Sequence, residues 1–132
     1  MKSCIFCKIA AGKVPCHKIY EDKDYIAFLD IKPLRKGHAL IIPKKHYRWP
    51  YDVTNFGQYM EVVKIVCLAQ KKAFKAVSVS IGTVGYDIAH AHVHTVPRTR
   101  GESGFVKTSN VTRISHDEME KIAARIRKFV KN

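Results

Sequence analysis

The sequence predicts an α+β fold in which an antiparallel sheet of five strands packs against one main helix and a C-terminal helix. Two observations support this. In two segments apolar residues recur every three or four positions, which is the period of an amphipathic helix. Elsewhere, short apolar runs alternate with turn-forming residues, as is typical of strands. The chain has 132 residues, 46% of them apolar, which suits a single domain over residues 1–132 with one hydrophobic core.

Three strands are expected in the first third of the chain. Residues 18–30 read KIYEDKDYIAFLD and predict a hairpin, because two apolar runs flank a charged turn. After a loop, residues 38–42 predict a buried strand that Pro43 ends.

A helix, two further strands and a last helix complete the expected order. The helix spans about 55–75 and is capped by Asn55 with Gln58. Residues 77–81 and 88–96 predict two strands around a glycine-containing turn. The last helix is expected over 115–131, after the capping-box pair Ser115 and Glu118. The order β-β-β-α-β-β-α indicates an antiparallel sheet backed by helix.

Charge and cysteine content limit the classes of partner. Lys and Arg total 24 and Asp and Glu total 11, so the formal net charge is +13. Such a charge attracts phosphates, nucleotides, nucleic acid or anionic lipid, or it only keeps the surface solvated. No apolar run approaches the length of a membrane span, and the N-terminus lacks the apolar region of a secretory signal. We therefore expect a cytoplasmic protein with no membrane partner, whose four cysteines are thiols or metal ligands.

The strongest chemical signal is the segment 90–98, which reads HAHVHTVPR. On a strand, His90, His92 and His94 would point to one face, with about 6.6 Å between neighbours. Zinc–nitrogen bonds are only about 2 Å long, so one ion cannot easily gather all three. Three interpretations remain: a polar strand face, a metal-dependent hydrolase, or a nucleophilic histidine assisted by its neighbours.

This segment resembles the His-x-His-x-His signature of the histidine triad family of nucleotide hydrolases and transferases. Residues 4–47, CIFCKIAAGKVPCHKIYEDKDYIAFLDIKPLRKGHALIIPKKHY, resemble the N-terminal half of that family, so the resemblance covers about residues 4–98. It is closest to the nucleotide-binding, phosphoramidase branch. The resemblance implies a homodimer that hydrolyses purine nucleoside phosphoramidates or related conjugates and releases a nucleoside monophosphate such as AMP. Cleavage of dinucleoside polyphosphates is the alternative within the same chemistry.

The resemblance also implies a role for each matching residue. His92 would be the nucleophile, with His94 holding charge beside the phosphate and His38 supporting the nucleophile through a hydrogen bond. His90 belongs to the same catalytic row. Asp30 would bind both ribose hydroxyls, since a carboxylate accepts two such bonds well. The other matching positions are Phe28 and Ile31 at the base, Ser80 near the phosphate, and Tyr86 and Asp87 just ahead of the triad.

A structural zinc ion is implied by the same resemblance. The pair Cys4-x-x-Cys7 is a weak motif on its own, because structural zinc takes four ligands. Some family members complete the set with residues that match His46 and His90. The implied zinc would tie the N-terminus to the active strand and would not be needed for the chemistry. Two free thiols without metal are the alternative.

The sequence departs from the family pattern at Gly85-Tyr86-Asp87, where many members carry Gly-Gln-Ser or Gly-Gln-Thr. Tyr86 keeps one hydrogen-bond donor, but the Asp87 carboxylate repels phosphate unless it binds an amine leaving group or a cation. An amine on a phosphoramidate therefore suits Asp87 better than a polyphosphate does. The rival hypothesis is a basic module that binds nucleotide or nucleic acid without turnover. Against it, the aromatic residues do not form one stacking platform with the basic residues.

Overall fold

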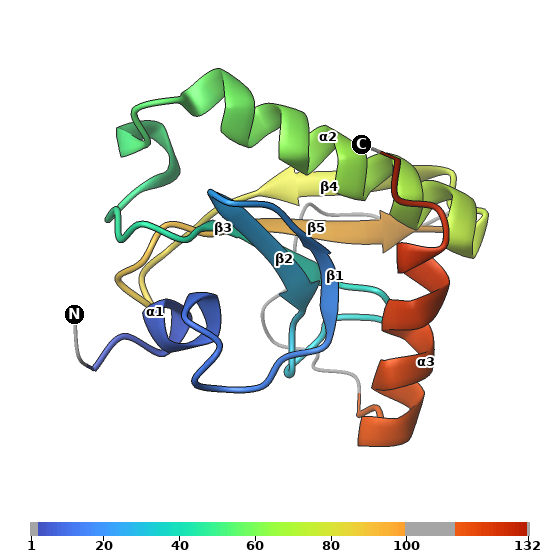
Figure 1. Cartoon of the computed structure of the whole chain (residues 1–132). Helices are drawn as coiled ribbons and strands as arrows, with labels where there is room; N and C mark the ends of the chain where they lie inside the picture. Colours follow the sequence, from blue (N-terminus) through green and yellow to red (C-terminus); the bar gives the residue numbers. More distant parts are fainter. Residues whose placement is uncertain (1–2, 100–112, 132) are drawn as a thin grey trace.

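The computed structural model describes residues 3–99 and 113–131. Its centre is an antiparallel sheet of five strands in the order β1-β2-β3-β5-β4 (Figure 1), which confirms the predicted α+β fold. The strands are β1 (Lys18–Glu21), β2 (Tyr25–Leu29), β3 (Ala39–Pro43), β4 (Ser78–Gly82) and β5 (Val93–Arg98). The helices are α1 (Ile5–Ala10), the short 3-10 helix η1 (Pro50–Asp52), α2 (Phe56–Phe74) and α3 (His116–Arg127).

The two faces of the sheet bury different sets of side chains. Helices α2 and α3 cover one face, where residues such as Ile41, Val66 and Ile122 form the larger part of the core. The short helix α1 covers part of the other face and packs Phe6 against Phe28. The ring of Phe6 also lies edge-on to His92, with 5.3 Å between ring centroids. The histidines of the triad therefore lie on the α1 side of the sheet, next to a small apolar cluster.

The caps of both long helices are as expected. The Asn55 side chain accepts a hydrogen bond from the backbone N–H of Gln58 at 3.3 Å, and Ser115 accepts one from Glu118 at 3.1 Å. These bonds satisfy backbone donors that the first helical turn leaves without partners. Helix α3 ends at Arg127, so the prediction that it reaches residue 131 was too long by one turn.

The strand expected over residues 88–96 begins later, at Val93. The cause is that the backbone before Val93 bonds to the loop after β3 and not to β3 itself. Val93 is opposite Ile41 of β3, whereas the backbone N–H of Ala91 donates to the carbonyl of Tyr47 at 2.7 Å. His90 and His92 therefore precede the strand, and only His94 belongs to it. Helix α1 and η1 were not expected, and β3 includes Pro43 rather than ending before it.

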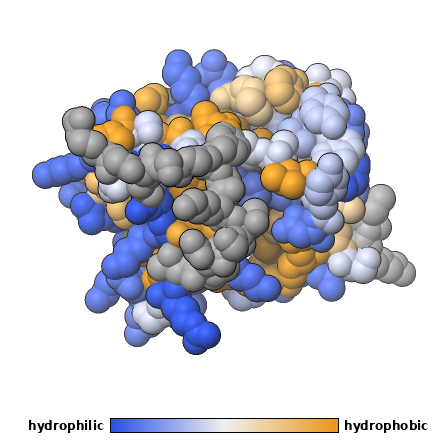
Figure 2. Space-filling model, turned by 180° about the vertical axis from the view of Figure 1, so that it is seen from behind, coloured by the Kyte–Doolittle hydropathy of each residue, from blue (hydrophilic) through white to orange (hydrophobic). Residues whose placement is uncertain are grey.

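The surface agrees with the high charge. From behind, hydrophilic side chains project along the margins of the molecule, with separate apolar patches between them (Figure 2). Among residues 3–99 and 113–131, no helix combines the length and the hydropathy that crossing a membrane would need.

Candidate active site and metal centre

His92 is held by the backbone immediately before it. Its Nδ1 lies 2.7 Å from the carbonyl oxygen of His90, and the side chain is buried. Because a carbonyl only accepts, Nδ1 must carry the proton and donate. In the neutral ring the lone pair is then on Nε2, which lies 3.6 Å from Oδ1 of Asp87. The ring therefore presents an unprotonated nitrogen toward the exposed Asp87 side chain.

His38 and His94 form a second, directional pair. The backbone N–H of Leu34 donates to Nδ1 of His38 at 3.1 Å, so the His38 proton is on Nε2. That nitrogen lies 2.9 Å from Nδ1 of His94, which must accept. The remaining proton of His94 is thus on its own Nε2. The prediction is that His38 supports the nucleophile through a hydrogen bond; in the structure its Nε2 donates to His94, whose ring neighbours that of His92.

Burial keeps this pair neutral. Desolvation lowers the pKa of both His38 and His94 to about 4. The side chain of Gln70, on α2, joins the residue before His38 to the residue after His94. It donates to the backbone carbonyls of Gly37 at 2.8 Å and Thr95 at 3.0 Å. Sequence reasoning missed Gln70, because a polar residue within a helix gives no signal of its position against the sheet.

His38, His94 and His92 lie next to one another, and we call them the histidine row. A carboxylate stands at each end of this row. Oδ2 of Asp30 lies 3.6 Å from Nε2 of His38, while Asp87 lies beside His92. The His92 and His94 rings are neighbours, with 5.1 Å between centroids. Burial raises the pKa of Asp30, and the backbone N–H of Lys32 partly opposes this by donating to its Oδ1 at 2.8 Å. The order along the row is therefore Asp30, His38, His94, His92, Asp87.

The other predicted contact residues lie in different surroundings. Phe28 is buried against Phe6, whereas Ile31 is 78% exposed. Ser80 is on β4 and accepts a hydrogen bond from Arg98 at 3.2 Å. Tyr86 is 84% exposed and lies edge-on to Trp49.

The four residues implied as zinc ligands do come together. Their ligand atoms all lie within 4.8 Å of one another, and we refer to Cys4, Cys7, His46 and His90 as the cysteine–histidine cluster. Nδ1 of His90 is 3.3 Å from Sγ of Cys4 and 3.4 Å from Sγ of Cys7, and Nδ1 of His46 is 3.3 Å from Sγ of Cys7. Tetrahedral zinc would hold sulfur and nitrogen ligands about 3.5 Å apart, given its usual bond lengths.

Proton positions in the cluster also suit a cation. Nε2 of His90 lies 2.8 Å from the carbonyl oxygen of Pro43 and must donate to it, which leaves the Nδ1 lone pair directed at the two thiols. Such an outer hydrogen bond is the usual support of a metal-bound histidine. Burial raises the pKa of the Cys7 thiol to about 11, so its deprotonation would depend on a bound cation.

An aromatic cluster that sequence reasoning missed lies beside the histidine row. Residues 48–51 and 86 are far apart in the chain, yet Trp49 contacts both Tyr51 and Tyr86, and Arg48 lies on its ring. One cation and three aromatic rings thus form a local group that the sequence analysis did not indicate. The only sequence signal was the density of residues 48–51, RWPY.

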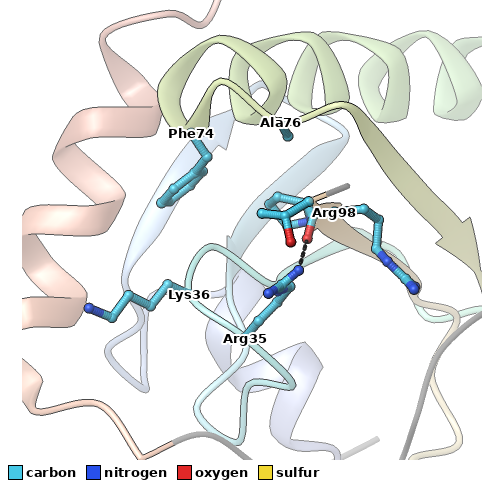
Figure 3. A pocket seen from close by; sticks show the side chains of 7 residues that line it. Arg35, Lys36, Phe74, Ala76 and Arg98 are labelled. Atoms are coloured by element: carbon cyan, nitrogen blue, oxygen red, sulfur yellow. Dashed lines mark hydrogen bonds between the residues drawn. The ribbon is translucent and has the colours of Figure 1, made fainter. Parts of the chain in front are cut away.

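A separate cavity of about 340 Å³ lies at the far end of β5 (Figure 3). Arg35, Lys36 and Arg98 line it beside Phe74. Arg35 donates to the carbonyl of Pro97 at 3.3 Å, and Lys36 pairs with Glu118 at 2.8 Å. Two of these cations therefore also contact other parts of the fold, Arg35 at β5 and Lys36 at α3.

Comparison with known proteins agrees with this geometry. The model of a family described as the HIT domain matches residues 11–101. The chain belongs to the HIT family. An uncharacterized HIT-like protein of Methanocaldococcus jannaschii is 40% identical over 126 residues, covering 89% of this chain and 96% of that protein.

Two further similar proteins bear on the site. An adenosine 5′-monophosphoramidase of Schizosaccharomyces pombe is 37% identical over 106 residues, which are 78% of this chain and 80% of that protein. The crystal structure of a zinc-bound histidine triad family protein from Mycobacterium smegmatis has a TM-score of 0.79 at 28% identity. That match covers 98% of this chain and 94% of the other.

Proposed function

We propose that this HIT protein hydrolyses nucleoside phosphoramidates or related nucleotide conjugates through a nucleotidyl-histidine at His92. The observation that carries the proposal is the orientation of that ring. Its Nδ1 donates to the carbonyl of His90, so the lone pair of the neutral ring is on Nε2, which lies 3.6 Å from Oδ1 of the exposed Asp87 side chain. The similarity to the phosphoramidase of Schizosaccharomyces pombe supports this substrate class.

The reaction proceeds in two displacements at the α-phosphorus. Nε2 of His92 attacks, a phosphorus–nitrogen bond to the ring forms, and the bond to the leaving amine breaks. The amine takes one proton from solvent. The nucleotidylated ring of His92 is cationic and keeps the hydrogen bond from Nδ1–H to the carbonyl of His90. Water then attacks phosphorus, the bond to Nε2 breaks, the nucleoside monophosphate leaves and one proton returns to solvent, so protons and charge balance over the cycle.

The neighbouring groups act by position and hydrogen bonding. His38 keeps the proton of His94 on Nε2, from which it donates to a phosphate oxygen and stabilises the charge that develops there. Asp30 binds the ribose hydroxyls at one end of the row. Asp87, at the other end, attracts the leaving amine. A polyphosphate leaving group would meet this carboxylate, so cleavage of dinucleoside polyphosphates is the less favoured alternative.

The cysteine–histidine cluster is proposed to hold a structural zinc ion through Cys4, Cys7, His46 and His90. Such an ion would cross-link the segment before α1, the loop after β3 and the triad, and so stabilise the fold. The histidine row does not need it, because the proton on Nε2 of His38 already bonds Nδ1 of His94.

We further propose a two-fold homodimer with a joined sheet. In the described sheet, β4 pairs with β5 on one side only and is an edge strand. Val77, just before β4, is 49% exposed, and Ile81, within β4, is 48% exposed. An unpaired edge with apolar neighbours can pair with the same edge of a second copy. Light scattering of the eluting protein gives the mass that checks this.

The test of the function is detection of the covalent intermediate. Wild-type protein mixed with an adenosine phosphoramidate and quenched within one turnover should gain the mass of one adenylyl group. The His92→Asn variant should not gain it, whereas His116→Asn, which changes an exposed histidine on α3, should. Brief chelation should leave turnover intact. Absence of any adduct and of turnover in the wild type, despite binding of AMP, would favour the binding-module hypothesis instead.

A further inference from the structure

We infer that Trp49, Tyr51 and Tyr86, here named the aromatic corner, form a subsite for a planar aromatic group carried by the leaving amine. The inference rests on the proposed function and extends it to the identity of the leaving group. It gives a role to an exposed cluster of rings that includes Tyr86, the residue before Asp87.

The rings of the aromatic corner enclose an angle rather than a flat patch. Trp49 and Tyr51 are nearly parallel, with 6.1 Å between centroids and 6° between planes. Tyr86 is perpendicular to Trp49, at 6.2 Å and 90°. Tyr51 and Tyr86 are 68% and 84% exposed. A flat ring entering this angle can stack on one wall and meet another edge-on, the two arrangements that aromatic pairs favour.

The corner is held in place by backbone contacts from both of its segments. Gly85 has φ of +79°, and a Cβ there would lie 2.7 Å from Cζ3 of Trp49. The indole therefore rests directly on the glycine backbone just before Tyr86. The backbone N–H of Ala91 donates to the carbonyl of Tyr47, which is two residues before Trp49. This bond joins the segment that carries Trp49 to the residue before His92. The position of the corner is thus coupled to that of the nucleophile.

The corner lies on the leaving-group side of the reaction. Along the histidine row, Asp30 is at the nucleoside end and Asp87 at the other. Tyr86 directly precedes Asp87, whose Oδ1 is 3.6 Å from Nε2 of His92. Consecutive Cα atoms are about 3.8 Å apart, so the corner begins one residue away from the group that faces the leaving amine.

Charge decides between an aromatic and a cationic occupant. Aromatic rings beside a carboxylate could also hold an ammonium group. Here, however, the guanidinium carbon of Arg48 already lies 3.7 Å from the centroid of the Trp49 ring. A second cation on this ring would be repelled by Arg48. The two carboxylates beside the corner are engaged elsewhere, because Asp52 accepts from the backbone N–H of Trp49 and Asp87 is directed toward His92. An uncharged planar ring avoids this repulsion.

The test compares two adenosine phosphoramidates whose leaving groups are 2-phenylethylamine and 2-cyclohexylethylamine. These amines match in length and differ in the planarity of the ring; the phenyl amine is also the slightly weaker base, so the change of the ratio in the corner variants, which basicity does not affect, decides the test. In the wild type we expect kcat/KM to be about three- to tenfold higher for the phenyl compound, as aromatic contacts of this kind supply. Trp49→Leu and Tyr86→Leu should bring the ratio close to one. The matched control is Phe56→Leu, which removes a ring that is 43% exposed and should keep the wild-type ratio.

Each of the other outcomes contradicts either the aromatic subsite or the proposed function. Turnover of both compounds with a ratio near one in the wild type overturns the subsite and leaves the proposed function standing. A wild-type preference that survives both corner variants places recognition elsewhere and also overturns it. If neither compound is hydrolysed, the proposed function fails and the subsite falls with it. Loss of binding of a single-stranded oligonucleotide in Trp49→Leu, with the ratio unchanged, would assign the corner to nucleic acid.

Discussion

The cysteine–histidine cluster and the histidine row contain similar side chains within a few residues of each other, yet they suit different tasks. In the cluster, a backbone carbonyl takes the Nε2 proton of His90, and the Nδ1 lone pair turns toward two thiols. In the row, a carbonyl takes the Nδ1 proton of His92, and Nε2 is directed toward the exposed Asp87 side chain. The role of each ring therefore depends on which of its nitrogens meets a backbone acceptor.

The same comparison argues against a metal between Asp30, His38 and His94, although these residues also lie close enough to hold one. The N–H of Leu34 places the His38 proton on Nε2, the atom nearest to both partners. A protonated nitrogen cannot act as a ligand. The row is satisfied by its own hydrogen bonds, whereas the cluster has lone pairs and thiols that converge on one point.

The largest expected effect separates the two regions by chemistry. His92→Asn should lower kcat/KM for an adenosine phosphoramidate by about a thousandfold or more, because the nucleophile is lost. The amide of Asn can still donate toward the carbonyl of His90, so the melting temperature should change little. Steady-state kinetics, with His116→Asn as the control within about twofold of wild type, measure this. A residual rate within tenfold of wild type would remove His92 from the nucleophilic role.

The next largest effect is expected for a variant of the cysteine–histidine cluster. Cys4→Ser should reduce bound zinc, lower the free energy of unfolding by about 3 kcal/mol or more, and lower the melting temperature by about 10 °C or more. Cys16→Ser changes a partly buried thiol outside the cluster and should alter neither by much. Elemental analysis and thermal unfolding of both variants give the comparison. Equal melting temperatures and equal zinc content in the two variants would contradict a metal at Cys4.

A smaller effect concerns pH. The pKa of His38 is about 4 in the fold and about 6.5 when unfolded, so between these values the unfolded chain binds more protons. Stability should therefore fall as pH decreases from about 6.5 to about 4. His38→Gln removes this group, so its free energy of unfolding should depend less steeply on pH in that window. Urea unfolding at several pH values measures both slopes, and parallel curves would show that His38 does not contribute.

The smallest effect tests the backbone contact between the aromatic corner and the row. Gly85→Ala should cost about 1–2 kcal/mol, because φ is positive there and the new methyl group would meet Trp49. Gly57→Ala is the matched control. It lies in α2 with no atom within 4 Å of a new Cβ, and should stabilise the fold by about 0.5–1 kcal/mol. Chemical denaturation decides, and a neutral Gly85→Ala would mean that Trp49 moves aside at little cost.

Much of this protein was determined by the sequence itself. Apolar periodicity and capping residues located both long helices, and short apolar runs located the five strands, because these signals depend on neighbours within a few residues. The spacing of His90, His92 and His94 also indicated that one ion could not use all three. Helix α1 was missed, since its six residues, IFCKIA, are too few for a clear period.

Only the tertiary structure decided what each ring does. Two of the groups that orient them come from remote positions: the Pro43 carbonyl for His90 and the Tyr47 carbonyl that draws Ala91 away from the sheet. The Leu34 N–H at His38 and the His90 carbonyl at His92 are within four residues, but which of them meets which nitrogen depends on the folded backbone. The aromatic corner likewise joins residues 49–51 to residue 86. The spacing of residues along the chain indicates only which side chains could take part in a site. A remote hydrogen-bond acceptor, such as the Pro43 carbonyl at His90, selects one nitrogen of an imidazole only when separate segments meet in space, and the same holds for rings that pack together.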